Sequence, residues 1–330
     1  MATREAEQQH TDWTAGLRDF FVSQEGVLVV VLVVAVIGLT LSSPNFLTRA
    51  NLLNQLRLMT EVGLLALPMT FIIITGGIDI SVGSIFGFSA VMLGWLWQEV
   101  GLPLEVAIVG CIAIGTLAGL FNALFIVYVR VPPIIMTLAT LALYRGLAYG
   151  VSQARSARGY PEWFFRFGQE DTLGIPTQIW FFLVAAVIAW VLLARTPFGR
   201  GIYAIGNNVV GARFSGIPVD RYLVAIYTAS GFMAGLSGFL FTSRVSTTRA
   251  DAGTGMEMDV IAAVVLGGTS ILGGTGTIQG TVLGLLVIQL LKNGLSLSGV
   301  KGDATIVVIG VVLIASITLN NFLQRRFART

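Results

Sequence analysis

Asp79 is the residue whose type and position most directly suggest chemistry, because it is a carboxylic acid set between two long apolar runs. It stands in the segment TGGIDISVGS at residues 75–84, just before a new apolar run begins. As a helix cap, its carboxylate would accept backbone N–H groups that the first turn of the next helix leaves unpaired. As part of a path or gate, it would face a wet cavity. The two roles are compatible.

The other ionisable side chains within the apolar runs are Arg57, Glu61 and Arg145. Arg57 and Glu61 are four residues apart, a spacing that places both on one face of a helix. We therefore expect these two side chains to form a structural ion pair near one end of that helix.

Catalytic and metal-binding sets are missing from the sequence. His10 is the only histidine and stands in the polar N-terminal segment, and Cys111, the only cysteine, lies in an apolar run without a base partner. The glycine-rich run GGTSILGGTG at residues 267–276 lacks the lysine of a phosphate-binding loop, and neither Lys292 nor Lys301 has the flanking residues of one. We expect no enzymatic activity, no metal and no bound cofactor, and we interpret the run as a tight re-entrant or interhelical turn. A plain flexible connection is the alternative.

The composition identifies the environment in which these residues must be positioned. Of the 330 residues, 55% are hydrophobic and only 11% are charged, whereas a soluble globular chain is roughly 25% charged. This is a membrane protein. The net charge of +3 gives no basic face for nucleic acid, and continuous apolar runs disfavour a porin-like barrel, whose strands alternate apolar and polar residues.

The apolar runs predict an all-α polytopic membrane helix bundle, because a helix needs about 20 mostly apolar residues to cross the bilayer. We expect about ten transmembrane helices, with short or broken helices near the path. Pro68 predicts a kink in the second of these helices, and Pro132 and Pro133 predict the start of another. The approximate ranges of the ten spans are 26–43, 51–75, 81–98, 104–129, 133–151, 177–195, 222–243, 257–271, 278–295 and 303–320.

The distribution of basic residues orients the bundle. With the N-terminus inside, ten of the twenty basic residues lie on inner segments and seven on outer ones, and the positive-inside rule then places both termini in the cytoplasm. We expect a cytoplasmic N-terminal segment (1–25), a single transmembrane domain (26–321) and a basic cytoplasmic tail (322–330). The few charges within the spans argue against transport driven by protons or sodium.

The polar loop at residues 196–221 contains a short helix with both ends marked. Asn207 or Asn208 can cap its start, Gly216 can adopt the left-handed conformation after its end, and Pro218 prevents continuation. Two turns are too few to be stable alone in water. The apolar side chains Val209, Val210 and Phe214 therefore predict docking against a partner or against the inner face of the bundle. A helix lying on the membrane surface is the alternative.

At this loop the sequence resembles the permease subunits of bacterial ATP-binding-cassette (ABC) sugar importers of the ribose, rhamnose and autoinducer-2 group. The resemblance covers roughly residues 27–321 through four blocks in order, at 75–84, 131–141, 196–217 and 263–281. It implies an inner-membrane path formed with a second permease copy or a related permease. ABC ATPase subunits would use ATP and Mg on the cytoplasmic side, and a periplasmic sugar-binding protein would deliver the substrate.

The resemblance also implies which residues act. The loop looks like the coupling helix that docks on the ATPase, although the family often has Ala-Ala where this chain has Gly211-Ala212. The candidate coupling residues are Arg200, Ile205, Gly206, Asn207, Asn208, Val210, Ala212, Arg213, Phe214 and Gly216.

Two blocks, at residues 75–84 and 131–141, would lie near the translocation path. Their hydroxyl groups could meet sugar hydroxyls through weak, replaceable hydrogen bonds, or could bond to their own helix backbone. The candidate path or gate residues are Thr75, Asp79, Ser81, Ser84, Thr137 and Thr140.

The segment VSTTRADAG at residues 245–253 resembles a Ser/Ala-Arg-x-Asp segment of rhamnose and autoinducer-2 permeases. We therefore expect a deoxy-sugar or a sugar-like signal as substrate. The main alternative from another class is a stand-alone secondary carrier or facilitator for a small polar solute. A membrane-embedded enzyme or scaffold is disfavoured, because the sequence has no acid–base pair, nucleophile or metal set.

Overall fold

The computed structural model describes residues 24–300 together with 304, 307–308, 310–311 and 314. The described residues form a helix bundle, as predicted, and strand is confined to the antiparallel pair β1 (Asp171–Thr172) and β2 (Ile175–Pro176). The helices are α2 (Gln24–Ser42), α3 (Arg49–Ile74), α4 (Val82–Gln98), α5 (Leu104–Leu124), η1 (Phe125–Val129), α6 (Pro133–Ser152), η2 (Glu162–Phe167), α7 (Thr177–Arg195), α8 (Pro197–Asn207), α9 (Val209–Phe214), α10 (Val219–Val245), α11 (Met256–Leu266) and α12 (Ile278–Leu297).

Seven helices in the described part of the chain are long and apolar enough to cross a membrane. Helix α4 is apolar but has 17 residues. The eighth predicted span, 257–271, is short and interrupted by glycine, and it contains α11, which has 11 residues and would rise only about 16 Å of a roughly 30 Å hydrocarbon layer. Most of the tenth predicted span, the basic tail and nearly all of residues 1–25 lie outside the described residues, so a count of ten spans and the placement of both termini stay predictions.

The helix start predicted at Pro132 and Pro133 is confirmed, whereas the kink at Pro68 stays a prediction. Pro132 is the N-cap of α6 and Pro133 is its first residue, a position where the missing N–H leaves no bond unmade. Pro68 lies inside α3, which continues as a helix to Ile74. Proline thus starts one membrane helix and is accommodated within another.

Glycines at four-residue spacing bring α5 and α10 into close contact at the centre of the bundle. A Cβ atom on Gly231 would lie 2.2 Å from the backbone oxygen of Gly115, and one on Gly119 would lie 2.8 Å from the Cα of Gly231. Because such distances exclude any side chain, glycine is required for this approach. On α6, by contrast, Gly146 and Gly150 face open space.

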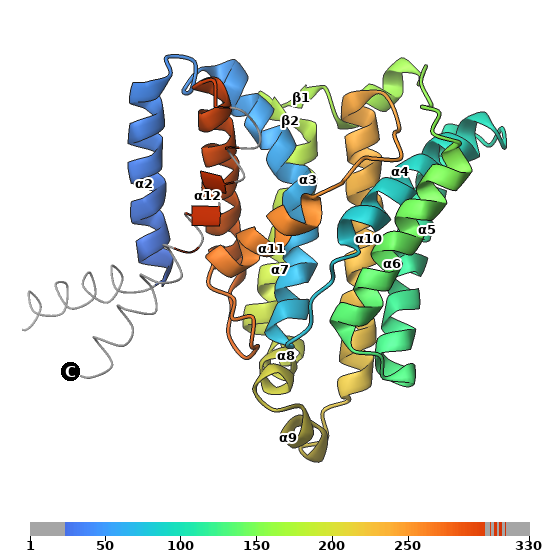
Figure 1. Ribbon diagram of the computed structural model, residues 1–330, viewed down its shortest axis with the longest axis vertical. Coiled ribbons are helices and arrows are strands. Elements are labelled where there is room, and N and C mark those ends of the chain that lie inside the picture. The colour runs from blue at the N-terminus through green and yellow to red at the C-terminus, as the bar shows by residue number, and fades with distance from the viewer. Residues whose placement is uncertain (1–23, 301–303, 305–306, 309, 312–313, 315–330) are drawn as a thin grey trace, which may run out of the picture.

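Two membrane passages are interrupted inside the bundle (Figure 1). Helix α3 ends near α8. The irregular segment at residues 75–81 then returns into the bundle, and α4 starts in the middle of it. At the opposite end, α10 is followed by segment 246–255, which descends to the start of α11. The two interruptions meet, since a Cβ on Gly83 would lie 2.5 Å from Glu257 Oε2 and 2.6 Å from Gly253 O. The bundle therefore contains irregular backbone between its helices, in agreement with the predicted short or broken helices.

The two ends of the bundle differ. Helices α8 and α9 project from one end, and β1, β2 and η2 lie at the other (Figure 1). Helices α2 and α12 flank the bundle on the side away from α5 and α6.

Candidate coupling surface and polar interior

Helix α8 carries the first part of the predicted coupling loop. Thr196 caps its start by accepting from Gly199 N at 3.4 Å, and Pro197 is its first residue. Its buried face contains Ile202 and Ile205, whereas Arg200 is exposed. Only one short helix was predicted in this loop, so α8 was not predicted, although the apolar spacing across residues 198–205 is a helical signal.

Gly206 fixes how α8 sits against the bundle. A Cβ atom on Gly206 would lie 1.9 Å from the carbonyl oxygen of Ile74 at the end of α3 and 2.6 Å from the amide nitrogen of Gly274. The Gly274 N–H itself donates to Ile74 O at 2.9 Å. Helix α8, the end of α3 and the glycine-rich turn are therefore locked together, and no larger residue fits at position 206.

The glycine-rich run at residues 267–276 forms a compact turn between α11 and α12, as interpreted from the sequence. Ser270 N donates to Thr275 O at 3.0 Å, and Gly273 N donates to Ser270 O at 2.9 Å. The phenol of Tyr203 in α8 donates to Gly276 O at 2.7 Å, and burial raises the pKa of that phenol. The contact with α8 is a feature that the sequence analysis missed.

Helix α9 has the predicted end signals. Asn208 Oδ1 accepts from Gly211 N at 2.8 Å, Gly216 has a φ of +80°, and Ile217 N donates to Ala212 O at 3.1 Å. Pro218 then ends the segment. Asn208 is thus the N-cap, and the alternative that Asn207 caps this helix is wrong.

Asn207 is instead the last residue of α8. Its Nδ2 donates to Tyr203 O at 2.8 Å, and its side chain packs beside Gly274. The residue therefore lies where α8 meets the glycine-rich turn.

The side chains of α9 divide between an anchoring face and an exposed face. Ala212 is buried in a small apolar cluster with Ile205 and Val219, and Arg213 forms an ion pair with Asp220. In contrast, Val209 is 42% exposed, Val210 62% and Phe214 89%. The alternative in which these side chains dock on the inner face of the bundle is therefore wrong, whereas docking on a partner and lying on the membrane surface both stay predictions.

Asp79 lies fully buried at the start of α4, where it accepts three hydrogen bonds. Its Oδ1 accepts from Ser81 N at 3.0 Å and from Ser81 Oγ at 2.6 Å. Its Oδ2 accepts from Ser230 Oγ, on α10, at 2.9 Å. The predicted N-cap role of Asp79 is wrong, since Ser81 is the N-cap of α4 and no side chain caps that helix. The Asp79 carboxylate instead joins the start of α4 to α10.

Asn122 extends this network and was missed by the sequence analysis. Its Nδ2 donates to Ser81 Oγ at 2.8 Å, and its Oδ1 accepts from Tyr144 at 3.3 Å. The Tyr144 phenol also lies 2.9 Å from Ala118 O. Asn122 sits between apolar neighbours in α5, and an amide within such a run was the available signal, because a buried amide needs partners.

The remaining candidate path hydroxyls bond to backbone. The oxygens of Thr75, Ser84, Thr137 and Thr140 lie 2.7–3.0 Å from carbonyls three or four residues earlier. Thr137 also lies 3.2 Å from Ile78 O, so it reaches from α6 to the interrupted segment. These contacts match the alternative in which each hydroxyl forms a hydrogen bond with a nearby backbone carbonyl rather than with a sugar.

The predicted ion pair between Arg57 and Glu61 is wrong. Arg57 Nη2 lies 2.6 Å from Asp171 Oδ1, and Glu61 pairs with Arg244 of α10 at 2.6 Å. Each side chain thus pairs with a residue distant in sequence, because the packing of the helices brings Asp171 and Arg244 close to Arg57 and Glu61. The pair spacing along one helix could not reveal either partner.

Arg145 holds the second interrupted segment. Its Nη1 donates to Ala250 O and to Ala252 O, both at 2.7 Å. In the same segment, Arg249 pairs with Asp251 through bonds of 2.9 and 2.6 Å, and the guanidinium hydrogen bonds lower the pKa of that carboxyl. The Arg-x-Asp motif of the sequence is therefore a local, exposed ion pair.

The comparisons with known proteins agree with this architecture. A family model described as branched-chain amino acid transport system / permease component matches residues 51–317. The ribose import permease protein RbsC of Bacillus subtilis is 42% identical over 297 residues, or 89% of this chain and 90% of the relative. The autoinducer 2 import system permease protein LsrD of Escherichia coli K12 is 36% identical over 296 residues, covering 88% and 89%.

A third relative, the ribose import permease protein RbsC of Haemophilus influenzae, is 33% identical over 308 residues, or 92% of this chain and 94% of the relative. No solved structure matches the chain at a significant level. The chain belongs to this family of transport-system permease components, and it is a multi-pass inner-membrane protein.

Proposed function

We propose that this chain is the transmembrane permease subunit of an ATP-driven importer that moves a sugar or sugar-like small molecule across the inner membrane. Rhamnose, autoinducer-2 and ribose-like compounds are the candidate substrates. The ribose and autoinducer-2 import permeases among its relatives support this class, and the exposed Arg249–Asp251 pair lies in the motif that suggested a deoxy-sugar or signal molecule.

The observation that carries the proposal is the exposed apolar face of α9. A phenylalanine that is 89% exposed on a helix of six residues would be a liability for a polar loop in water, unless a partner covers it. The helix is anchored on α8, which is in turn fixed to the end of α3 and to the glycine-rich turn. Movement of a partner bound at α9 would therefore reach the transmembrane helices directly.

That partner is an ABC ATPase subunit, which uses ATP and Mg in a site of its own, and the permease itself is not the enzyme. This assignment places α8 and α9 on the cytoplasmic side and β1, β2 and η2 on the periplasmic side, where a sugar-binding protein delivers the substrate. A second permease copy or a related permease completes the path. The cytoplasmic position of both termini belongs to the same proposal.

The competing class is a stand-alone secondary carrier or facilitator. It predicts transport without ATP and without a stoichiometric soluble partner. To separate the two, the chain is co-purified with the products of neighbouring genes and assayed for vanadate-sensitive ATPase activity. Activity that rises with the cognate binding protein supports the importer, whereas its absence in an intact complex supports the carrier.

The substrate is tested by uptake of labelled rhamnose, ribose and autoinducer-2 into vesicles that contain the complex and its binding protein. ATP-dependent uptake of one of them supports the proposal. Transport of none of the three eliminates this substrate class.

A further inference from the structure

A small polar cavity lies at the end of the bundle opposite α8 and α9. It has a volume of about 130 Å³ and opens between the C-terminal ends of α4 and α6 and the loop that follows α6. Its polar lining comes from Gln98, Glu99, Ser152, Gln153, Arg155 and Ser156. The cavity is large enough for several water molecules or one small ring.

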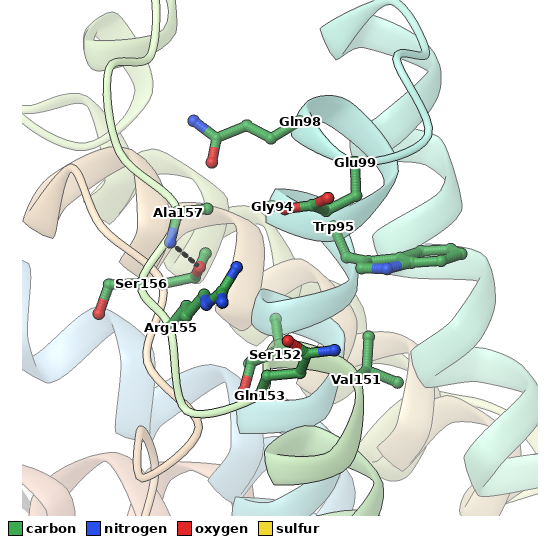
Figure 2. Close-up of a pocket in the computed structure, with 12 residues that line it drawn as sticks. Gly94, Trp95, Gln98, Glu99, Val151, Ser152, Gln153, Arg155, Ser156 and Ala157 are labelled. Carbon is green, nitrogen blue, oxygen red and sulfur yellow. Dashed lines mark hydrogen bonds between the residues drawn. The ribbon is translucent and has the colours of Figure 1, made fainter.

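Two opposite charges face this cavity without pairing (Figure 2). The carboxylate of Glu99 and the guanidinium of Arg155 project toward the same space, and no salt bridge within 4.0 Å joins them. Within the described residues, neither side chain has a hydrogen-bond partner, and the Gln153 amide likewise has none. All three side chains are exposed to solvent, so three strong polar groups that have no partner within the described residues surround one cavity.

The backbone that presents these groups is held in an unusual conformation. Gln153 and Ala154 are consecutive residues with φ values of +49° and +56°, and Arg155 N donates to Ser152 O at 2.8 Å. Non-glycine residues adopt this left-handed region rarely, and strain of this kind gathers at functional sites. The turn places the side chains of residues 153 and 155 on the cavity.

The wall of the cavity near Ala157 is hydrogen-bonded to segment 246–255. Thr248 N donates to Ala157 O and Ala157 N donates to Thr248 Oγ1, both at 3.2 Å, and Gln98 Nε2 donates to Arg158 O. A Cβ on Gly94 would lie 2.6 Å from the Ala157 side chain, so α4 approaches this wall closely. The cavity is therefore bounded by fixed backbone and communicates with segment 246–255.

The chemistry of the lining selects a neutral polyhydroxylated ligand. A carboxylate accepts hydrogen bonds from hydroxyl groups, whereas a guanidinium and an amide N–H₂ donate to hydroxyl oxygens. The lining carries one negative charge, on Glu99, and one positive charge, on Arg155. An anionic ligand would be repelled by Glu99, and a cationic ligand would be repelled by Arg155. Trp95 and Val151 add apolar surface at the edge, which suits the C–H face of a sugar ring.

We propose that this cavity is a binding subsite for one monosaccharide ring at the outer mouth of the permease. Its outer position and the sugar class rest on the proposed function. The site itself rests on the unpaired groups of Glu99, Gln153 and Arg155. It would hold the substrate after delivery and before passage into the bundle.

The test measures sugar binding to the full-length chain in lipid nanodiscs, without ATPase or binding protein. Saturation-transfer NMR titrations with D-ribose and L-rhamnose report binding to the wild type and to Glu99→Gln and Arg155→Gln. Each substitution removes a charged hydrogen-bonding group, so we expect affinity to fall about tenfold. Arg166→Gln is the matched control, since Arg166 is at the same end, pairs with Glu170 and does not line the cavity.

Equal affinity in the wild type and both cavity variants overturns the proposal, as does failure of the wild type to bind either sugar. Glu99 and Arg155 are exposed, so thermal unfolding should match the wild type and show that the variants are folded. ATP-dependent uptake by the complete complex is measured separately. Uptake with no binding at this cavity would reject the subsite alone, whereas binding without ATP-dependent uptake would reject the proposed importer.

Discussion

Glu61 of α3 and Arg244 of α10 form a bidentate ion pair within the bundle. Arg244 Nε lies 2.6 Å from Glu61 Oε1, and Arg244 Nη2 lies 3.0 Å from Glu61 Oε2. The carboxylate side chain is only 6% exposed, and Ser237 Oγ donates to the backbone oxygen of Glu61 at 3.0 Å. The pair joins two central helices where a lone charge would lack water to solvate it.

Arg244→Gln should destabilise the bundle strongly, because it leaves the Glu61 carboxylate buried without its cation. Breaking a buried pair typically lowers stability by about 3–5 kcal/mol. Thermal unfolding in detergent measures the effect. Arg166→Gln, which disrupts an exposed pair of 3.8 Å with Glu170, should leave the midpoint nearly unchanged. Similar midpoints for the two variants would show that the Glu61 pair does not stabilise the fold.

Phe214→Ala should weaken docking of the ATPase while the permease stays folded, since the ring is 89% exposed. Loss of a central aromatic contact lowers binding by about 2 kcal/mol, or roughly thirtyfold. We expect ATP hydrolysis to become uncoupled from uptake. Leu173→Ala is the control for ATPase binding alone, because Leu173 is 87% exposed in the turn between β1 and β2, which lie at the opposite end. Uptake unchanged by Phe214→Ala would refute the docking role.

Asn207→Ala should also uncouple hydrolysis from uptake, by a different route. The Asn207 amide bonds to Tyr203 O and packs beside Gly274, so its loss loosens α8 from the glycine-rich turn. The ATPase should still bind, and the loss should appear in uptake per ATP hydrolysed. A parallel loss of ATPase binding would argue for direct contact instead.

Gly206→Ala should disrupt the packing of α8 against the end of α3, whereas Gly211→Ala should be tolerated. The added methyl at position 206 would lie 1.9 Å from Ile74 O, but at position 211 its nearest neighbour is 3.4 Å away. Alanine also favours a helix by about 1 kcal/mol over glycine. Assembly of the complex and uptake should fall only for Gly206→Ala. Equal losses of uptake in the two variants would mean that the contact between Gly206 and Ile74 O can adjust to an added methyl group.

Asp79→Ala should lower stability more than Asp79→Asn does. Alanine leaves Ser81 N–H without its acceptor and breaks the link to Ser230, whereas asparagine retains an acceptor oxygen; an unpaired buried group costs about 1–3 kcal/mol. Thermal unfolding compares the two, with Ser84→Ala as the control, since that hydroxyl bonds within its own helix. A stable Asp79→Asn variant that loses uptake would indicate a role in the path rather than a purely structural link between α4 and α10.

Much of the fold could be predicted from local pattern. Apolar length located the long spans to within a few residues, and Asn208, Gly216 and Pro218 marked α9, because capping and left-handed turns depend on neighbouring residues. The exposure of Phe214 agrees with the docking prediction, although the sequence could not tell partner from bundle. The roles of these residues stay predictions until they are measured.

The polar contacts between distant segments could not be predicted. Arg57 and Glu61 suited a pair by spacing, yet each found a partner on another element, and Asn122 gave no sign of bonding to Ser81. Such contacts depend on which helices become neighbours, and one sequence does not specify that.

Arg145 binds segment 246–255 through the carbonyl oxygens of Ala250 and Ala252, and not through their side chains. Main-chain recognition is indifferent to the identity of the side chains beyond it. The exposed positions of the segment, including Arg249 and Asp251, can therefore be exchanged while its course through the bundle is preserved. A single scaffold could in this way be retuned to different cargoes by changes at a few outward-facing positions.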